Sequence, residues 1–328
     1  MAGVSRYNIE SLSLDDYTAL LEGREYPLYF APWWLQVVMP LDEWVCLACY
    51  DAGRCLALFV ARLIGGQIVT PPYCQYTGVL FLEDALTSYE KQTIIQVFHY
   101  QVPSHAYYHL NYSPDYIDWL GLYWLGYGQS TRYNYVWDVA MLQTAEDIRS
   151  TISASLRKNL KSTERAGFVY LPSVQLSDVK DILSSTALYK GYKGDLPLML
   201  RLMHQGLVRG EAQVIGVANA MGELAMVAFW VEHQGVAYLI GEGTDRLRGG
   251  KYQLKVFMLM NYILSRRQTI GKIDFEGSML EPIAKIYQAL RADQQSYMTI
   301  TKGWRYHPGV LWCKLFARWR EKFNAKKK

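Results

Sequence analysis

The chain has 328 residues, of which 51% are hydrophobic and 20% are charged, and its formal net charge is +4. These values are close to those of ordinary globular proteins, so they exclude an intrinsically disordered chain and a collagen-like or low-complexity fibre. No uncharged apolar run of about 18 residues occurs, and the first residues lack the apolar core of a secretory signal. We therefore expect no transmembrane segment and a cytoplasmic protein.

The cysteines and histidines do not follow metal-ligand patterns. Five cysteines, an odd number, fit a reducing compartment better than a disulfide framework. Cys46 and Cys49 form a C-x-x-C, but no second pair follows at zinc spacing, which favours two ordinary strand cysteines. His105 and His109 are four residues apart in a predicted strand, where this spacing does not form a helical metal clamp. We predict no metal site.

The positive charge is concentrated at the C-terminal end. Nine Lys and Arg residues lie between Lys302 and Lys328, against the single Glu321, so the rest of the chain is mildly acidic. An aromatic stripe recurs there at helical steps of four, three and four: Trp312, Phe316, Trp319 and Phe323. The pattern predicts a basic amphipathic helix over residues 304–328. This helix either binds an anionic membrane or nucleic acid, or docks its aromatic stripe on the protein core.

Residues 1–143 are predicted to form one α/β domain. The hairpin signal Asp51-Ala-Gly-Arg54 separates two β-rich runs, and two prolines end a strand at Pro71-Pro-Tyr-Cys-Gln-Tyr-Thr-Gly78. The predicted strands are 44–50, 55–62, 67–70, 106–111 and 132–138, with a helix at 87–100.

A second α/β domain is predicted over residues 144–303. It begins with the capped helix start Thr144-Ala-Glu-Asp147, and Gly167 ends the helical segment 148–166. The predicted strands that follow are 168–171, 212–218, 224–232, 236–241, 272–275 and 297–301, and the predicted helices are 177–190, 196–207, 252–267 and 282–290.

A basic loop with glycines separates the strand 236–241 from the helix that starts at Tyr252. It reads Glu242-Gly-Thr-Asp-Arg-Leu-Arg-Gly-Gly-Lys251. Backbone N–H groups at a helix start bind anions, and the basic side chains add countercharge, so a pyrophosphate would fit this loop. The loop is neither a Walker loop nor a G-x-G-x-x-G fingerprint. The alternative is a glycine turn that only caps the helix.

The order of strand, basic loop, helix, short strand, helix and final strand resembles the cofactor half of GCN5-related N-acetyltransferases (GNAT). Specifically, the chain resembles the tandem-domain branch that includes BioF2-like acetyltransferases and Fem-type aminoacyl (peptidyl) transferases. The resemblance covers residues 30–302 approximately, although Lys251 departs from the small residue usual at the sixth loop position. It rests on Arg246-Leu-Arg-Gly249, Asp274-Phe-Glu-Gly-Ser278, the basic helix Ser155-Leu-Arg-Lys-Asn-Leu-Lys-Ser162, Trp33-Trp34 and Pro71 to Gly78.

This resemblance implies an α/β fold of two acetyltransferase-like domains. Each would be a mixed, mostly antiparallel sheet flanked by helices, and the basic C-terminal helix would follow. The second domain would hold the acyl donor through Arg246, Arg248, Gly249, Gly250, Lys251 and Tyr252.

The implied chemistry is attack of an amine on an activated acyl carbonyl, which needs a base, an oxyanion donor and an acid. Tyr287 matches the helix tyrosine that protonates the departing thiolate in many acetyltransferases, or else it only packs. Glu242, Asp274 and Glu276 are candidate bases, or else structural carboxylates. Candidate acceptor contacts, which could equally be core or solvent-exposed residues, are Tyr73, Gln75, Tyr76, Arg157, Lys158 and Trp230.

Three functional hypotheses follow. The first is an N-acyltransferase that transfers an acyl group from acyl-CoA to an amine acceptor. The second is a Fem-like transferase that uses aminoacyl-tRNA and acts on a cell-wall precursor or another amine. In that case residues 304–328 would contact tRNA phosphates or an anionic membrane, at the inner face of which the protein would be peripheral. The third is a non-catalytic module of the same fold that binds membrane or RNA.

Overall fold

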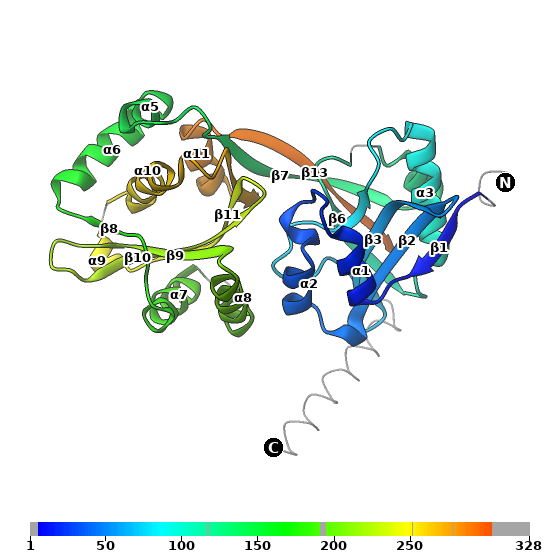
Figure 1. The fold of residues 1–328 in the computed structure, drawn as a ribbon. Helices are drawn as coiled ribbons and strands as arrows, with labels where there is room; N and C mark the ends of the chain where they lie inside the picture. Colours follow the sequence, from blue (N-terminus) through cyan, green and yellow to red (C-terminus); the bar gives the residue numbers. More distant parts are fainter. Residues whose placement is uncertain (1–5, 117, 191–194, 251, 278, 304–328) are drawn as a thin grey trace, which may run out of the picture. The chain divides into compact units, whose positions relative to one another are not determined.

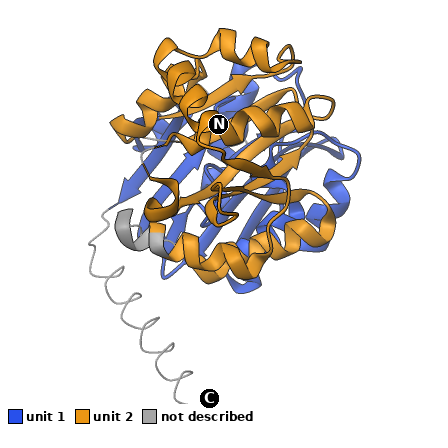
Figure 2. Cartoon of the chain, turned by 90° about the vertical axis from the view of Figure 1, so that its left-hand side faces the viewer, with its two compact units in different colours: residues 1–132, 296–328 blue, residues 133–295 orange. Residues whose placement is uncertain are grey.

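The computed structural model describes residues 6–116, 118–190, 195–250, 252–277 and 279–303. The chain forms two compact units, shown in Figure 2: unit 1 comprises Met1–Arg132 and Ser296–Lys328, and unit 2 comprises Tyr133–Gln295. Unit 2 thus begins before the predicted domain boundary at 143/144, and residues 296–303 belong to unit 1. The predicted helix over 304–328 lies outside the described residues.

Unit 1 contains a mixed sheet with the strand order β1, β2, β3, β4, β6, β13, and β5 pairs with β3. Neighbouring strands are antiparallel except β4 and β6, which are parallel. The predicted hairpin is confirmed, since Asp51 pairs with Arg54 across Ala52 and Gly53, both of which have positive φ. The strands are β1 (Asn8–Ser11), β2 (Trp44–Asp51), β3 (Arg54–Ile64), β4 (Gln67–Val69), β5 (Gly78–Phe81), β6 (Tyr107–Tyr112) and β13 (Asp293–Gly303).

The helix Ser88–Gln101 of unit 1 begins at a reciprocal cap. Thr87 accepts a hydrogen bond from the N–H of Glu90, and the Glu90 side chain accepts one from the N–H of Thr87. The helices are α1 (Leu14–Leu21), α2 (Pro32–Val38), α3 (Ser88–Gln101) and α4 (Leu120–Trp124), with short 3-10 turns η1 (Leu28–Phe30) and η2 (Leu41–Glu43).

Unit 2 contains a sheet with the strand order β7, β12, β11, β10, β9, β8. Only β11 and β12 are parallel to each other. The strands are β7 (Gly128–Asp138), β8 (Val169–Leu171), β9 (Ala212–Ala218), β10 (Leu224–His233), β11 (Val236–Thr244) and β12 (Lys272–Gly277). The mixed, mostly antiparallel sheet expected from the sequence is therefore present in each unit.

Helices cover both faces of the unit 2 sheet. In Figure 1, α5, α6, α10 and α11 lie above the strands, and α7 and α8 lie below them. The predicted cap at Thr144 and Asp147 is confirmed, but the helical segment predicted at 148–166 is two helices, because Ile152 is extended and Ser153 caps a new helix. The helices are α5 (Ala145–Thr151), α6 (Ala154–Arg165), α7 (Leu176–Lys190), α8 (Leu196–Arg209), α9 (Arg246–Gly249), α10 (Leu254–Arg266) and α11 (Glu281–Ala289).

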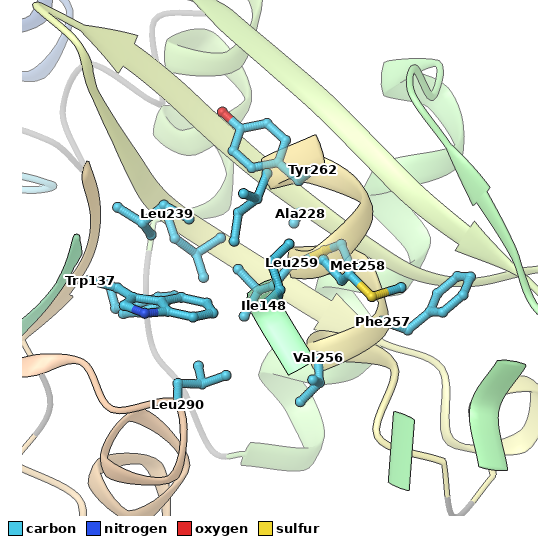
Figure 3. Close-up of a cluster of buried hydrophobic side chains, with 14 of the residues drawn as sticks. Trp137, Ile148, Ala228, Leu239, Val256, Phe257, Met258, Leu259, Tyr262 and Leu290 are labelled. Atoms are coloured by element: carbon cyan, nitrogen blue, oxygen red, sulfur yellow. The ribbon is translucent and has the colours of Figure 1, made fainter. Parts of the chain in front are cut away.

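The core of unit 2 lies between the sheet and α10. In Figure 3, Val256 and Leu259 of α10 lie in one cluster of buried side chains with Ile148 of α5 and Leu239 of β11. Full burial of a side chain of this size stabilises the fold by about 1.5–3 kcal/mol relative to its exposure. This packing fixes α10 against β11, and so it fixes the polar groups that the two elements share.

In the described residues Cys46 and Cys49 are unreactive, and neither a metal-binding cluster nor a membrane-spanning helix occurs. Cys46 and Cys49 are buried in β2, and burial raises the pKa of the Cys49 thiol to about 12, so both are inert strand residues as predicted. No cluster of three or more His, Cys, Asp or Glu side chains that could hold a metal ion occurs in the described ranges. Within those ranges, no helix combines the length and the apolar character that crossing a bilayer requires.

Candidate active site

The two parallel strands of unit 2 separate partway along their length. Their ladder has the pairs Val236 with Lys272, Ala237 with Ile273, and Tyr238 with Asp274, although β11 continues to Thr244 and β12 to Gly277. The backbone groups that β11 turns toward β12 beyond Tyr238 are thus not used in this ladder. On its other side β11 has a bulge, because the partners of Phe229 and Trp230 are Gly241 and Leu239, which leaves Ile240 unmatched.

The residues that follow the bulge alternate between the two faces of the sheet. A Cβ atom on Gly243 would lie 3.0 Å from Ile182 of α7, and one on Gly241 would lie 3.1 Å from Met199 of α8. Both glycines therefore allow close packing of the lower helices. Because side chains alternate along a strand, Glu242 between them points to the opposite face, where α10 and α11 lie.

Glu242, Lys255 and Tyr287 meet on that face. The ammonium of Lys255 donates hydrogen bonds to Glu242 Oε1 at 3.1 Å and to the hydroxyl of Tyr287 at 3.2 Å. The Lys255 side chain is only 10% exposed. A buried ammonium is stable only when it is paired, and here Glu242 supplies the opposite charge.

Rings hold the Tyr287 side chain in place. Its ring stacks on Phe275 with the centroids 4.6 Å apart and an interplanar angle of 14°, and it lies 5.3 Å from the ring of Tyr135. The Lys255 ammonium also lies 4.6 Å from the centroid of the Tyr287 ring.

The electrostatics leave Lys255 charged and Tyr287 protonated at neutral pH. Burial by itself lowers the pKa of Lys255, but Glu242 and Tyr287 together raise it above its ordinary value. Burial raises the pKa of Tyr287, and the neighbouring Lys255 opposes part of that rise. The arrangement therefore presents a neutral phenol, already accepting a hydrogen bond from a cation, which can give its proton to a developing anion.

Asp274 lies apart from this cluster. It is buried and points to the face opposite Phe275, because the two are neighbours in a strand. Its carboxyl accepts hydrogen bonds from the N–H of Glu276 at 2.7 Å and from Asn134 Nδ2 at 3.3 Å. Burial nevertheless raises the pKa of Asp274 to about 6. Its observed contacts hold the backbone of β12 at Glu276.

Glu276 has a positive φ of 57°, which is uncommon for a residue with a side chain. The pairing of β12 with β7 shifts register between Asp274 and Gly277, so the regular alternation of β12 ends here. The charge of Glu276 raises the pKa of Tyr287, although less than burial does.

The basic loop uses most of its own backbone donors. Asp245 caps α9 by accepting hydrogen bonds from the N–H groups of Leu247 and Arg248. The N–H groups of Gly249, Gly250 and Tyr252 donate to Asp245, Arg246 and Gly249 carbonyls, respectively. Lys251 lies outside the described residues. The described part of the loop is thus a turn that bonds to itself around α9.

Some donors near the loop remain for an anion. Helix α10 starts at Leu254 with Gln253 as its N-cap, and no side chain caps this end. Arg248 is partly engaged, since its NH1 donates to the Leu224 carbonyl at 3.3 Å and its Nε lies 3.6 Å from Asp245. Tyr252 packs edge-on against Phe168.

No protein-family model matches this chain, and no curated protein matches it. Several solved structures do. FemX is similar with a TM-score of 0.62 at 10% sequence identity, over 89% of this chain and 96% of that chain. The C-terminal domain of a putative lysylphosphatidylglycerol synthetase from Agrobacterium fabrum has a TM-score of 0.57 at 9% identity, over 91% and 95% of the two chains. A tandem GNAT protein from the clavulanic acid biosynthesis pathway has a TM-score of 0.53 at 11% identity, over 90% and 97%.

The chain has the tandem GNAT-like fold. The resemblance inferred from the loop and strand motifs is therefore confirmed at the level of the fold. At sequence identities of 9–11%, this similarity shows a shared fold and does not show a shared activity.

The candidate acceptor residues of this GNAT-like chain are divided between the two units. Trp230 is fully buried and stacks on Tyr262 with the centroids 4.3 Å apart, so its ring belongs to the core of unit 2. Arg157 donates to the carbonyls of Arg149 and Ile152 and so joins α5 to α6, while the neighbouring Lys158 is exposed.

The other three acceptor candidates lie in unit 1. Tyr76 packs edge-on against Tyr29, and Tyr73 has a positive φ of 56°. Neither amide atom of the buried Gln75 side chain has a hydrogen-bond partner within the described part of the chain. An unpaired buried amide costs about 1–3 kcal/mol, so Gln75 remains a candidate for contact with a bound molecule.

Lys255 is the functional candidate that the sequence analysis missed. It stands alone in the otherwise apolar first turns of α10, Leu-Lys-Val-Phe-Met-Leu-Met. A single charge inside an apolar helical run indicates a buried ion pair or a site, and this signal was available in the sequence.

Proposed function

We propose that this protein is an acyltransferase that joins an activated acyl group to the nitrogen of an amine acceptor. One observation carries the proposal: the Tyr287 hydroxyl is held by the buried Lys255, whose charge is paired with Glu242 at the end of β11. Glu242 lies on β11 beyond Tyr238, where the β11–β12 ladder ends, while Lys255 and Tyr287 come from α10 and α11. A GNAT-like fold is consistent with this chemistry.

The proposed reaction uses backbone N–H groups of β11 and the side chains of Tyr287, Lys255 and Glu276, all in unit 2. The amine nitrogen attacks the acyl carbonyl, and the resulting oxyanion accepts hydrogen bonds from β11 backbone N–H groups beyond Tyr238. When the bond from carbon to the leaving group breaks, Tyr287 gives its proton to the departing atom, with Lys255 positioning the hydroxyl. Glu276 takes the proton from the amine, because Glu242 is held by Lys255 and Asp274 faces the other side of the sheet.

The first candidate donor is an acyl-CoA thioester. Its pyrophosphate would bind at the uncapped start of α10, with Arg246, Arg248 and Lys251 as countercharges. One protein of the same fold, the tandem GNAT protein, has a structure described with reference to acetyl-CoA.

The second candidate donor is aminoacyl-tRNA, in which the leaving atom is a ribose oxygen. The loop itself favours this alternative, because its own N–H groups are already bonded and the Asp245 carboxylate occupies the start of α9. A pyrophosphate would meet fewer free donors here than an open glycine loop offers. The acceptor in this case would be a cell-wall precursor or another amine.

A single assay series tests the proposal and separates the donors. Purified protein is incubated with a panel of amines and either acyl-CoA or aminoacyl-tRNA, and amide formation is measured for the wild type and for Tyr287→Phe. We expect Tyr287→Phe to lower kcat by about 10²–10⁴-fold with either donor, because general acid catalysis contributes an effect of that size. Replacing Arg246, Arg248 and Lys251 with alanine should abolish acyl-CoA binding in calorimetry only if acyl-CoA is the donor.

Tyr135→Phe is the matched control. It removes a hydroxyl from a ring that packs on Tyr287, but this hydroxyl accepts a hydrogen bond from Gln294 and not from Lys255. We expect activity close to that of the wild type. Equal losses in the two variants, or no amide formation with either donor, would contradict the proposal and leave the non-catalytic module.

A further inference from the structure

Helix α4 of unit 1 exposes large side chains on one side. Tyr123 and Trp124 are 60% and 61% exposed, and Leu120 is also exposed. Tyr123 and Trp124 follow Leu120 by three and four positions, so all three side chains lie on one side of the helix. On the other side Gly121 packs on α3, where a Cβ atom would lie 3.2 Å from the Gln92 carbonyl oxygen. The exposed side chains thus stand on a helix whose opposite side packs on α3.

The supporting helix α3 adds two more exposed rings. Tyr89 and Tyr100 lie near its two ends, about 16 Å apart along the axis. Gln92 and Gln96 between them bond Asp118 and the Gly121 carbonyl, respectively, and so tie α4 to α3. We call Tyr89, Tyr100, Leu120, Tyr123 and Trp124 the aromatic surface. Single exposed apolar residues are ordinary, but a group of this kind on two packed helices marks an interaction site.

The basic end of the chain starts beside this surface. Lys302 donates a hydrogen bond to the carbonyl of Leu125, the residue that follows α4, at 2.6 Å. Its ammonium lies 4.7 Å from the centroid of the Tyr127 ring. Residues 304–328 follow directly and contain eight Lys and Arg residues against one Glu. The structure therefore places Lys302, shortly before the basic segment 304–328, at the C-terminal end of α4.

We propose that the aromatic surface binds the headgroup region of an anionic lipid bilayer, with the basic residues of 304–328 attracted to the same lipids. Tyr and Trp have an apolar body and a polar tip, which suits them to the boundary between water and hydrocarbon. Each Lys or Arg near an anionic membrane adds about 1 kcal/mol. None of the five side chains of the aromatic surface is charged, so their own transfer into the interface buries no charge. The proposal does not depend on the proposed catalytic activity.

Sedimentation of the full-length protein with lipid vesicles tests the proposal without any acyl donor. We expect binding to vesicles of mixed phosphatidylcholine and phosphatidylglycerol, weaker binding to phosphatidylcholine alone, and weaker binding at high salt. The double variant Tyr123→Ser/Trp124→Ser should lower the partition into anionic vesicles by at least about fivefold, because both rings lose their contact with the interface. The second double variant Tyr89→Ser/Tyr100→Ser should lower it as well.

Met221→Ser is the matched control. Met221 is 78% exposed, but it lies in the turn between β9 and β10 of unit 2, so its replacement should leave the partition unchanged. The proposal is overturned if wild-type protein does not bind anionic vesicles, or if both double variants bind them like the wild type. It is also overturned if the protein binds single-stranded RNA more tightly than anionic vesicles and Tyr123→Ser/Trp124→Ser weakens that RNA binding, because the rings would then be a platform for base stacking.

Discussion

Burial decides the protonation state of His99 in unit 1. Its Nδ1 lies 2.9 Å from the hydroxyl of Tyr127, and its Nε2 lies 3.1 Å from that of Tyr112, which in turn is 2.7 Å from the hydroxyl of Tyr108. A neutral imidazole has one donor and one acceptor, which the two hydroxyls can satisfy. Burial lowers the pKa of His99 to about 3.

This lowered pKa predicts a loss of stability in acid. Between about pH 6.5 and pH 3 the unfolded chain binds a proton at His99 and the folded chain does not. The free energy of unfolding therefore falls as the pH decreases, by up to about 1.4 kcal/mol per pH unit. Urea unfolding at pH 7 and pH 5 should show a smaller pH dependence for His99→Gln than for the wild type, even though the variant is less stable at pH 7. An identical pH dependence would show that His99 is not held neutral.

Successive residues of strand β11 contact helices on opposite faces of the sheet. Gly241 and Gly243 admit the lower helices, and Glu242 between them reaches Lys255 on the upper side. A side chain at Gly243 would meet the branched carbons of α7, whereas one at Gly241 would meet the flexible end of Met199.

We predict different costs for the same substitution at these two glycines. Gly243→Ala should destabilise the protein by about 1–3 kcal/mol, because the new Cβ would lie 3.0 Å from both Ile182 and Thr186 and a packed helix must shift. Gly241→Ala should cost less, since the end of Met199 can move aside. Thermal unfolding of the two variants measures the difference, and equal costs would mean that α7 adapts as readily as Met199.

At the scale of the whole molecule, unit 1 is assembled from both ends of the chain. Strand β13 pairs antiparallel with β6 from Met298 opposite Tyr112 to Gly303 opposite Tyr107. Thr299 donates a hydrogen bond to Asn111 at 2.8 Å, and Ile300 is fully buried in the unit 1 core. Unit 1 thus needs residues that follow all of unit 2 in the sequence.

This topology predicts an unequal response to truncation. A chain that ends at Gln295 keeps every residue of 1–132 but loses most of β13, so β6 becomes an unpaired edge and the core loses Ile300. We expect limited proteolysis to cut this truncated protein within residues 1–132 much faster than within 133–295. Cleavage at similar rates in both units would contradict a structural requirement for β13.

Local patterns explain why so many elements were predictable. The Asp51 to Arg54 turn, the cap at Thr144 and the strand 212–218 each depend on residues within a few positions, and all three were confirmed. The break at Ser153 was missed although Ser150, Thr151 and Ser153 lie there, which are residue types that favour helix caps and turns. The motifs also indicated the tandem GNAT-like fold correctly.

The motifs and local patterns were enough to predict the fold class, most elements, and Glu242 and Tyr287 as candidate catalytic residues, whose roles remain predictions. Three findings required the packed chain: Lys255 joins these two residues, Asp274 faces the other side of the sheet, and Trp230 is a core ring. The residues concerned are far apart in the sequence. Glu242, Lys255 and Tyr287 meet because α10 and α11 pack on one face of β11 and β12, and no local pattern encodes that packing.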